Sequence, residues 1–254
     1  MFKEHILNKL EKTDLSEIFH VFQPQLNLNN NKIIGVEMLS RWKYKDSTIS
    51  PAIFIELAEE YNLIWKIDFL SLENAMEFIK EHNIKTSVNL SMKTLNQTFF
   101  EEIVKNILSK YSAKEIMNLS IEITETISGL PYDIVKKNLL FLTNMGIEIF
   151  LDDFTIGFAN LETLNEYPIT AIKIDKSIIK FFHKTSENKI LNSFITFLKC
   201  LELKIIFEGI EKLDEIKYLL RANIKNIFIQ GFYISEPLTK KELIYFLDVY
   251  RGAF

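Results

Sequence analysis

Polar side chains stand at or near the carboxyl end of seven segments that are typical of buried strands. They are Glu37, Asn89, Glu122, Asp152 with Asp153, Lys173, Glu208 and Gln230. One such residue by itself could cap the next helix, form a rim salt bridge or face solvent. Several carboxylates buried together are unfavourable unless a cation neutralises them. The set therefore predicts a cation site where the strands end.

The chemistry of such a site follows from its ligands, which would all be oxygen atoms, from Glu37, Asn89, Glu122, Asp152, Asp153 and Glu208. Oxygen ligands suit magnesium or manganese. The four histidines form no ligand pair, which disfavours a histidine-based metal hydrolase. Six candidates exceed what one octahedral ion usually takes, so we expect two ions, which would activate a water for displacement at phosphorus. Lys173 would position that water or help to remove its proton.

The elements that must hold these residues alternate along the chain. After an amphipathic helix within residues 1–16, two strands at 21–28 and 33–39 flank an Asn-rich turn and predict an antiparallel hairpin. Further strands are expected at 86–90, 119–123, 147–152, 171–174, 204–207 and 226–229. Helices are expected at 51–82, with a break near Asn62, and at 99–111, 132–145, 161–166, 188–201, 212–222 and 240–250. Gly146 is a natural residue to end the helix at 132–145.

This alternation predicts an α/β protein with a largely parallel sheet and helices outside it. At 254 residues, a closed (β/α)8 barrel of the TIM type is the simplest arrangement. An open doubly wound sheet is the alternative. No linker or repeat divides the chain, so we expect one domain over residues 1–254, with a helix at 1–16 and the barrel at 17–250.

Composition narrows the function further. The formal charge of −4 argues against DNA or RNA as a broad partner. No apolar run approaches the length of a membrane helix and no signal peptide is visible, so we expect a cytoplasmic protein. The single cysteine, Cys200, lies in an apolar stretch and is expected to pack in the core.

The chain also carries a set of short motifs in a fixed order. The motifs are Gln23-Pro24, Gly35-Val36-Glu37-Met38-Leu39-Ser40-Arg41-Trp42, Val88-Asn89-Leu90-Ser91, Ile121-Glu122-Ile123-Thr124-Glu125, Asp152-Asp153-Phe154, Ile172-Lys173-Ile174-Asp175, Glu208-Gly209-Ile210-Glu211 and Gln230-Gly231-Phe232, followed by Pro237. Together they resemble the EAL-domain cyclic di-GMP phosphodiesterases, with Met38 replacing the Ala of the name. The resemblance covers roughly residues 15–250.

The resemblance implies a barrel with an antiparallel first strand that hydrolyses cyclic di-GMP to linear pGpG with magnesium or manganese. The metal ligands it implies are Glu37, Asn89, Glu122, Asp152, Asp153 and Glu208. The implied catalytic residues are Lys173, with Glu211 supporting the metal site and Gln230 holding the attacking water. The positions that match substrate contacts are Gln23, Leu39, Arg41, Asp175 and Pro237. An arginine suits phosphate, because its planar fork donates two hydrogen bonds.

One loop departs from the family's pattern. After the two aspartates this chain has Phe154-Thr155-Ile156-Gly157-Phe158-Ala159, so the first Gly and the Thr of the family's loop are replaced. By resemblance this loop orders the metal site together with Glu125, the loop-stabilising residue, and joins the interface of a homodimer. Phe207 also replaces a usual Ala beside Glu208.

Three functions compete at this point. The intact ligand set favours an active cyclic di-GMP phosphodiesterase of bacterial signal transduction. The altered loop favours a catalytically weak EAL domain that acts as a cyclic di-GMP receptor or a protein-interaction module. Strand-end carboxylates with a lysine would also serve another metal-dependent reaction, such as enolate formation. The ordered motifs disfavour this third function.

Overall fold

A closed barrel of strands forms the centre of the protein. The computed structural model describes residues 2–124, 132–154, 158–178 and 189–251. In this part of the chain the strands are β1 (Ile18–Asn27), β2 (Lys32–Tyr44), β3 (Ser47–Ile49), β4 (Thr86–Asn89), β5 (Leu119–Ile123), β6 (Glu148–Leu151), β7 (Ala171–Ile174), β8 (Lys204–Phe207) and β9 (Ile227–Ile229). They pair in the order β1-β9-β8-β7-β6-β5-β4-β2-β3, and β1 also pairs with β2. This last pairing closes the ring, which confirms the predicted barrel over the open sheet.

The first strand runs against its neighbours. β1 is antiparallel to both β2 and β9, whereas the successive pairs from β2–β4 to β8–β9 are parallel. The predicted antiparallel first strand is thus confirmed. Gly35 permits the close approach of β2 to the start of β4, because a Cβ there would lie 2.7 Å from the carbonyl oxygen of Lys85.

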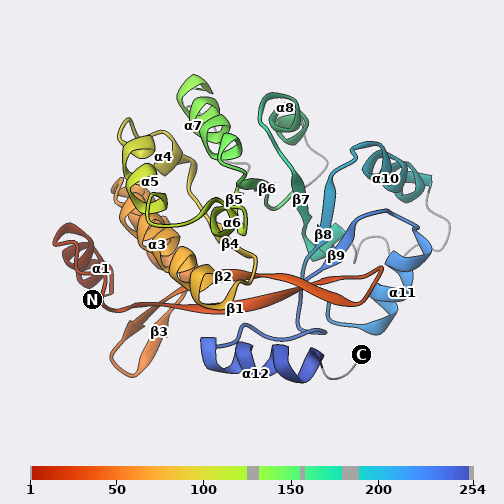
Figure 1. The fold of residues 1–254 in the computed structure, drawn as a ribbon, viewed down its shortest axis with the longest axis horizontal. Coiled ribbons are helices and arrows are strands. Elements are labelled where there is room, and N and C mark those ends of the chain that lie inside the picture. Colours follow the sequence, from red (N-terminus) through yellow and green to blue (C-terminus); the bar gives the residue numbers. More distant parts are fainter. Residues whose placement is uncertain (1, 125–131, 155–157, 179–188, 252–254) are drawn as a thin grey trace.

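Helices surround the barrel (Figure 1). The helices of the described residues are α1 (Phe2–Glu11), α2 (Pro51–Glu60), α3 (Ile64–His82), α4 (Met92–Leu95), α5 (Phe100–Leu108), α6 (Ala113–Ile116), α7 (Tyr132–Asn144), α8 (Phe158–Glu166), α10 (Lys189–Cys200), α11 (Leu213–Arg221) and α12 (Lys240–Arg251). Figure 1 shows α12 lying along the β1–β2 hairpin. Helix α1 and strand β3 lie at the end of the hairpin that is away from its turn.

Each strand has two faces with different roles. Outward residues such as Ile121, Ile149 and Ile205 join the large core between the barrel and the helices. Inward residues of β6 and β8, Phe150 and Ile206, belong to a separate small apolar cluster inside the barrel. Because successive side chains alternate between faces, the residues two positions beyond this inner cluster also point inward, at the carboxyl ends of the strands.

Several expectations about single elements need correction. The first helix ends at Glu11. Strand β2 continues to Tyr44, because it pairs with β1 as far as Trp42 and with β3 from Trp42 to Tyr44. Strand β3 and helices α4 and α6 were not predicted. The predicted helix break is confirmed: α2 and α3 are separated at Asn62, which has a φ of 55°.

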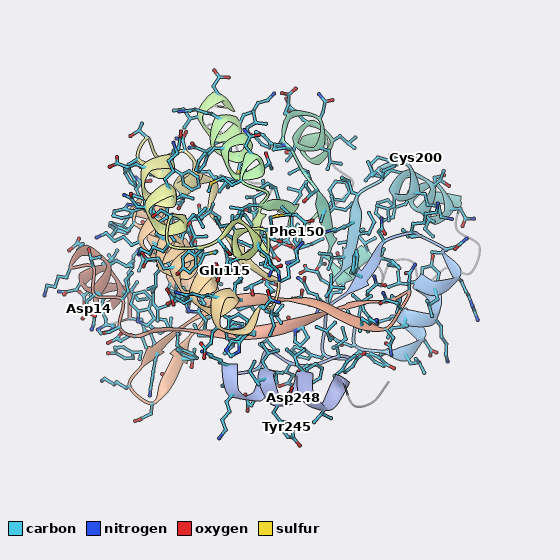
Figure 2. The ribbon with its side chains drawn as sticks, in the orientation of Figure 1. Asp14, Glu115, Phe150, Cys200, Tyr245 and Asp248 are labelled. Carbon is cyan, nitrogen blue, oxygen red and sulfur yellow. The ribbon has the colours of Figure 1, made fainter. Side chains whose placement is uncertain are left out.

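Cys200 does not pack in the core as expected, because its side chain is exposed. The buried face of α10 carries Phe194 and Leu198. Cys200 lies about 200° around the helix from Leu198, at about 100° per residue, and so faces outward. Figure 2 shows Cys200 at the outer edge of the molecule and Phe150 near its centre.

Candidate active site

A buried ring of charge occupies the carboxyl end of the barrel. Its centre is Lys173 on β7, whose side chain is 1% exposed. The Nζ atom lies 2.7 Å from Glu208 Oε1, 3.2 Å from Asp152 Oδ1 and 3.3 Å from Glu37 Oε2, and it donates a short hydrogen bond to Glu122 Oε2. Five residues from five strands or strand ends, all predicted for the site, are thus brought together.

Burial and mutual charge shift the pKa values of the residues in the ring. Burial raises the pKa of Glu208 to about 7 although Lys173 opposes the shift, and burial together with Glu37 raises the pKa of Glu122 well above its usual range. Burial also disfavours the Lys173 ammonium, but the carboxylates, Glu122 foremost, outweigh it and raise the pKa of Lys173 well above its usual value. The cations expected from the sequence would depress that pKa, whereas the protein's own groups act in the opposite direction.

Glu37 is held from three sides. Its Oε1 accepts a hydrogen bond from Asn89 Nδ2 at 2.9 Å, and its Oε2 accepts one from Gln230 Nε2 at 2.6 Å in addition to the Lys173 contact. Burial opposes ionisation of Glu37, but Lys173 and the amide donors prevail and lower its pKa. Asn89 uses its amide nitrogen on Glu37, so its carbonyl oxygen is the atom that would bind a cation. Asn89 and Glu122 are neighbours across β4 and β5.

The oxygen atoms of the ring fit a divalent cation. Oxygen atoms of Asp152, Asp153 and Glu208 all lie within 4.8 Å of one another. Burial and Asp152 raise the pKa of Asp153, whose backbone φ is 51°. The Oε1 atom of Glu122 is buried and has no hydrogen-bond partner within the described part of the chain. A buried carboxylate oxygen without a donor, beside clustered carboxylates of raised pKa, is what a hard cation would satisfy.

Next to the ring is a cavity of about 180 Å³. Two residues predicted to contact substrate, Leu39 and Arg41, line it together with Glu122 of the ring and the neighbouring Asn89. The cavity therefore lies where a ligand would meet both the ring and a guanidinium group. Burial lowers the pKa of Arg41.

The remaining predicted residues lie around this centre. Gln23 is buried and donates to the carbonyl of Ser235 at 3.2 Å. Asp175 accepts a hydrogen bond from the backbone of Ser177, and Pro237 precedes the residue that bridges to β1. Glu211 is exposed and pairs with Lys176 at 3.4 Å, so the described contacts do not join Glu211 to the ring. Glu125 and residues 155–157 lie outside the described residues, and the roles predicted for them stay predictions.

Sequence reasoning missed two buried polar residues, Asp68 and Gln25. Asp68 lines the same cavity, accepts hydrogen bonds from the Ser91 backbone and the Thr94 hydroxyl, and has a pKa raised by burial to about 7. Its position between Ile67 and Phe69 in an apolar helix face is a signal that could have identified it. Gln25 is buried and donates a hydrogen bond to Gln230.

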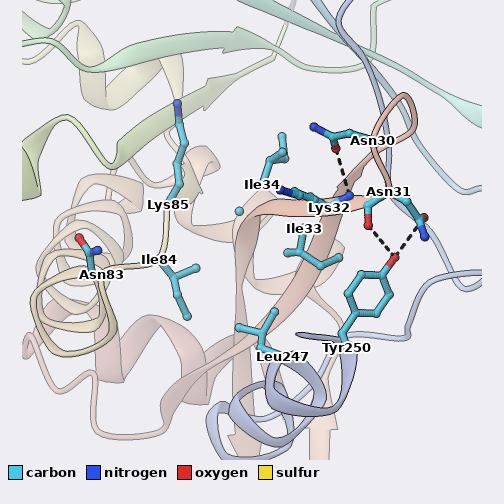
Figure 3. A pocket seen from close by; sticks show the side chains of 11 residues that line it. Asn30, Asn31, Lys32, Ile33, Ile34, Asn83, Ile84, Lys85, Leu247 and Tyr250 are labelled. Carbon is cyan, nitrogen blue, oxygen red and sulfur yellow. Dashed lines mark hydrogen bonds between the residues drawn. The ribbon is translucent and has the colours of Figure 1, made fainter. Parts of the chain in front are cut away.

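A different groove, of about 460 Å³, lies at the amino end of the barrel. Figure 3 shows Tyr250 of α12 donating to Asn31, with Leu247 beside Tyr250 and the Lys85 side chain pointing away from both. No described residue of the predicted site lines this groove. The predicted site residues that the structure describes thus lie away from this groove, and barrels of this type place their chemistry at the carboxyl end.

The family model described as "EAL domain" matches residues 7–237. The chain belongs to the EAL domain family. The EAL relatives include the signaling protein YkoW of Bacillus subtilis, at 30% identity over 89% of this chain, and MucR of Pseudomonas aeruginosa, a bifunctional diguanylate cyclase/cyclic di-GMP phosphodiesterase, at 30% identity over 88%. The chain spans 29% of YkoW and 33% of MucR.

Solved structures agree with the family. The EAL structure "PaMucR Phosphodiesterase, c-di-GMP complex" superposes with a TM-score of 0.80 at 27% identity, over 96% of this chain and all of that one. The EAL domain of FimX from Pseudomonas aeruginosa, at 22% identity and a TM-score of 0.80, shares the fold over 93% of this chain and 96% of that one. None of the described helices of this EAL domain combines the length and apolar character needed to cross a membrane.

Proposed function

We propose that this EAL domain is a metal-dependent phosphodiesterase that hydrolyses cyclic di-GMP to linear pGpG. The observation that carries the proposal is the ring around Lys173, in which four carboxylates meet one ammonium group. Those four carboxylates have more negative charge than one lysine balances. Relatives named as cyclic di-GMP phosphodiesterases support the substrate.

The residues proposed to hold magnesium or manganese are Glu37, Asn89, Glu122, Asp152, Asp153 and Glu208. One or two bound ions would polarise the scissile phosphate and lower the pKa of a water. In the proposed reaction the water oxygen bonds to phosphorus as the bond to the 3′ oxygen breaks, and a proton moves from the water to the leaving oxygen.

The chain's own groups would orient this reaction. Without a bound cation the surrounding carboxylates keep Lys173 in its ammonium form, which donates hydrogen bonds. A bound cation would depress the pKa of Lys173, so we assign Lys173 to positioning the water and helping to remove its proton. Gln230, with its amide nitrogen directed at Glu37, would hold the water's other side, and Arg41 would bind a phosphate oxygen.

A turnover assay with cyclic di-GMP and manganese tests the proposal, with Glu37→Gln as the matched variant. We expect the parent to release pGpG and the variant to retain less than about a tenth of the parent rate, since a lost metal ligand removes transition-state stabilisation. Hydrolysis by the variant above that level would contradict the assignment of the ring.

A second function is favoured by Thr155 and Ile156, which replace the family's Gly and Thr in one loop. Under it, the domain binds cyclic di-GMP without turning it over and passes the signal to a partner. Calorimetry separates the two functions. Tight binding of cyclic di-GMP with no pGpG at any manganese concentration would favour the receptor.

A further inference from the structure

Three glutamine side chains form a chain of hydrogen bonds behind Glu37. Gln25 Nε2 donates to Gln230 Oε1 at 3.0 Å, and Gln230 Nε2 donates to Gln23 Oε1 at 3.0 Å and to Glu37 Oε2 at 2.6 Å. Gln23 Nε2 completes the chain by donating to the Ser235 carbonyl. All three glutamines are buried, and Gln25 is 3% exposed.

The direction of this chain is fixed by the group at its end. The ionised carboxylate of Glu37 can only accept hydrogen bonds, so the nitrogen end of the Gln230 amide must face it. The carbonyl end of Gln230 then points the other way and needs a donor. Gln25 is the donor to that oxygen that the described part of the chain provides. Since an amide rotated by 180° would present its oxygen to Glu37, the Gln25 bond holds Gln230 in the productive orientation.

The backbone of Gln230 leaves only its side chain free to turn. Its carbonyl accepts from Ile210 N at 3.1 Å, and the following Gly231 has a φ of 153°. A Cβ on Gly231 would lie 2.3 Å from Ile210 backbone atoms, so this junction tolerates only glycine and packs tightly. The orientation of the terminal amide is therefore decided by its hydrogen-bond partners.

We propose that Gln25 is a positioning residue of the site, acting through Gln230 on Glu37. This inference rests on the proposed function. Gln25 lies on β1 two residues after Gln23, on the same inward face, and reaches the site from the layer below it. A glutamine that only filled the interior would make the same packing contacts, but the effect of replacing it on kcat would not depend on Gln230.

Kinetics distinguish these two roles through Gln25→Met, which keeps the size and removes the donor, and Gln25→Glu, which keeps the shape and presents an acceptor. We expect kcat to fall about threefold for Gln25→Met and about tenfold or more for Gln25→Glu, with KM within about twofold, as for the loss of one buried hydrogen bond. Gln97→Met is the matched control, because the Gln97 amide binds a carbonyl of its own helix region and should leave kcat unchanged.

A double-mutant cycle then tests whether Gln25 acts through Gln230. In the Gln230→Ala background, Gln25→Met should have no further effect on kcat, because the amide that it orients is gone. A full additional loss in that background, or an unchanged kcat in both single variants, would overturn the proposal.

A readout without turnover keeps this inference separate from the proposed function. The Gln230 side-chain NH₂ protons, assigned by their loss in Gln230→Ala, should exchange slowly in the parent and broaden or exchange faster in Gln25→Met but not in Gln97→Met. A parent that fails to hydrolyse cyclic di-GMP but shows this NMR pattern refutes the function and retains the positioning role. Unchanged Gln230 signals in Gln25→Met refute the positioning role.

Discussion

The two ends of the barrel hold polar clusters of opposite design. At the carboxyl end, one ammonium group, Lys173, contacts four carboxylates. At the amino end, one carboxylate, Glu148, forms short ion pairs with two lysines, Lys85 and Lys204, one on each of its oxygens. Both clusters point into the same barrel, and the apolar layer that contains Phe150 separates them.

The difference is one of charge balance. At the amino end, burial opposes ionisation of Glu148, but the two lysines prevail and lower its pKa. At the carboxyl end, carboxylates outnumber the lysine, and the pKa of Glu208 rises to about 7. The amino end has an excess of one positive charge, and burial lowers the pKa of Lys85 there. The carboxyl end would have an excess of three negative charges with all four carboxyl groups ionised, and this larger excess is the one that a further ligand would balance. The larger charge excess thus marks the carboxyl-end cluster as the candidate site.

The largest effect should come from removing the lysine of the carboxyl end. For Lys173→Ala we expect kcat to fall by about 10²–10⁴, equivalent to about 3–5 kcal/mol of barrier, with little change in affinity for cyclic di-GMP. Single-turnover kinetics beside calorimetric binding measure the two quantities. Lys204→Ala is the same change at the amino end and should leave kcat unchanged. Equal losses of affinity and turnover in Lys173→Ala would make Lys173 an anchor for the ligand instead.

The next effect is on stability at the amino end. Glu148→Gln leaves Lys85 and Lys204 facing each other without their carboxylate. The Glu148 side chain is 25% exposed, so water screens part of the loss, and we expect the free energy of unfolding to fall by about 1–3 kcal/mol. Urea unfolding measures it, and kcat should stay within about twofold. A large fall in kcat with unchanged stability would mean that the two ends are functionally coupled.

The same contrast explains what the sequence could predict. Alternation of apolar residues located β5 at residues 119–123, and the polar residue at the end of each strand identified the ring around Lys173. Glu37, by contrast, lies in the middle of β2 and not near its end. The polar residues Ser40 and Arg41 interrupt the apolar pattern, while pairing with β1 carries the strand to Trp42 and pairing with β3 carries it to Tyr44.

Roles that arise from distant contacts were not predictable. Gln25 acquires its partner Gln230 across 205 positions, and Asp68 acquires Thr94 across 26. Local periodicity reports which way a side chain faces but not which group it meets. Cys200 shows the same limit, because an apolar neighbourhood in sequence says little about which side of α10 a residue occupies.

In the presence of a chelator, Glu208 and Glu148 should change the free energy of unfolding in opposite directions as pH rises. The pKa of Glu208 is about 7 in the folded protein against 4.5 ordinarily, so the folded state holds a proton that the unfolded state has lost between these values. The free energy of unfolding should therefore fall, by about 1–2 kcal/mol from this group, as pH rises from about 4.5 to about 7. Glu148, whose pKa is lowered, contributes stability above its ordinary pKa that is lost as pH falls further.

Urea unfolding of the parent and of Glu208→Gln across this pH range tests the slope. Asp68 also has a pKa of about 7 and contributes in the same direction, so the two proteins must be compared at each pH. The variant should show the smaller decrease, and saturating manganese should reduce the decrease in the parent. Equal slopes for the two proteins would show that Glu208 does not hold the extra proton.

The smallest effect concerns the layer between the two ends. Ser120 on β5 lies inside the barrel beside a cavity of about 230 Å³, and its hydroxyl is buried without a hydrogen-bond partner among the described residues. Removing an unsatisfied buried hydroxyl relieves its desolvation penalty, so Ser120→Ala should leave the free energy of unfolding unchanged or raise it by up to about 1 kcal/mol. Ser87 is the matched control, because it lies in the same layer and its hydroxyl donates to the Val36 carbonyl, so Ser87→Ala should lower stability slightly. A loss above about 1 kcal/mol in Ser120→Ala would mean that the cavity holds water bound to this hydroxyl. The layer between the two ends would then contain water, and that water would link the two charge clusters.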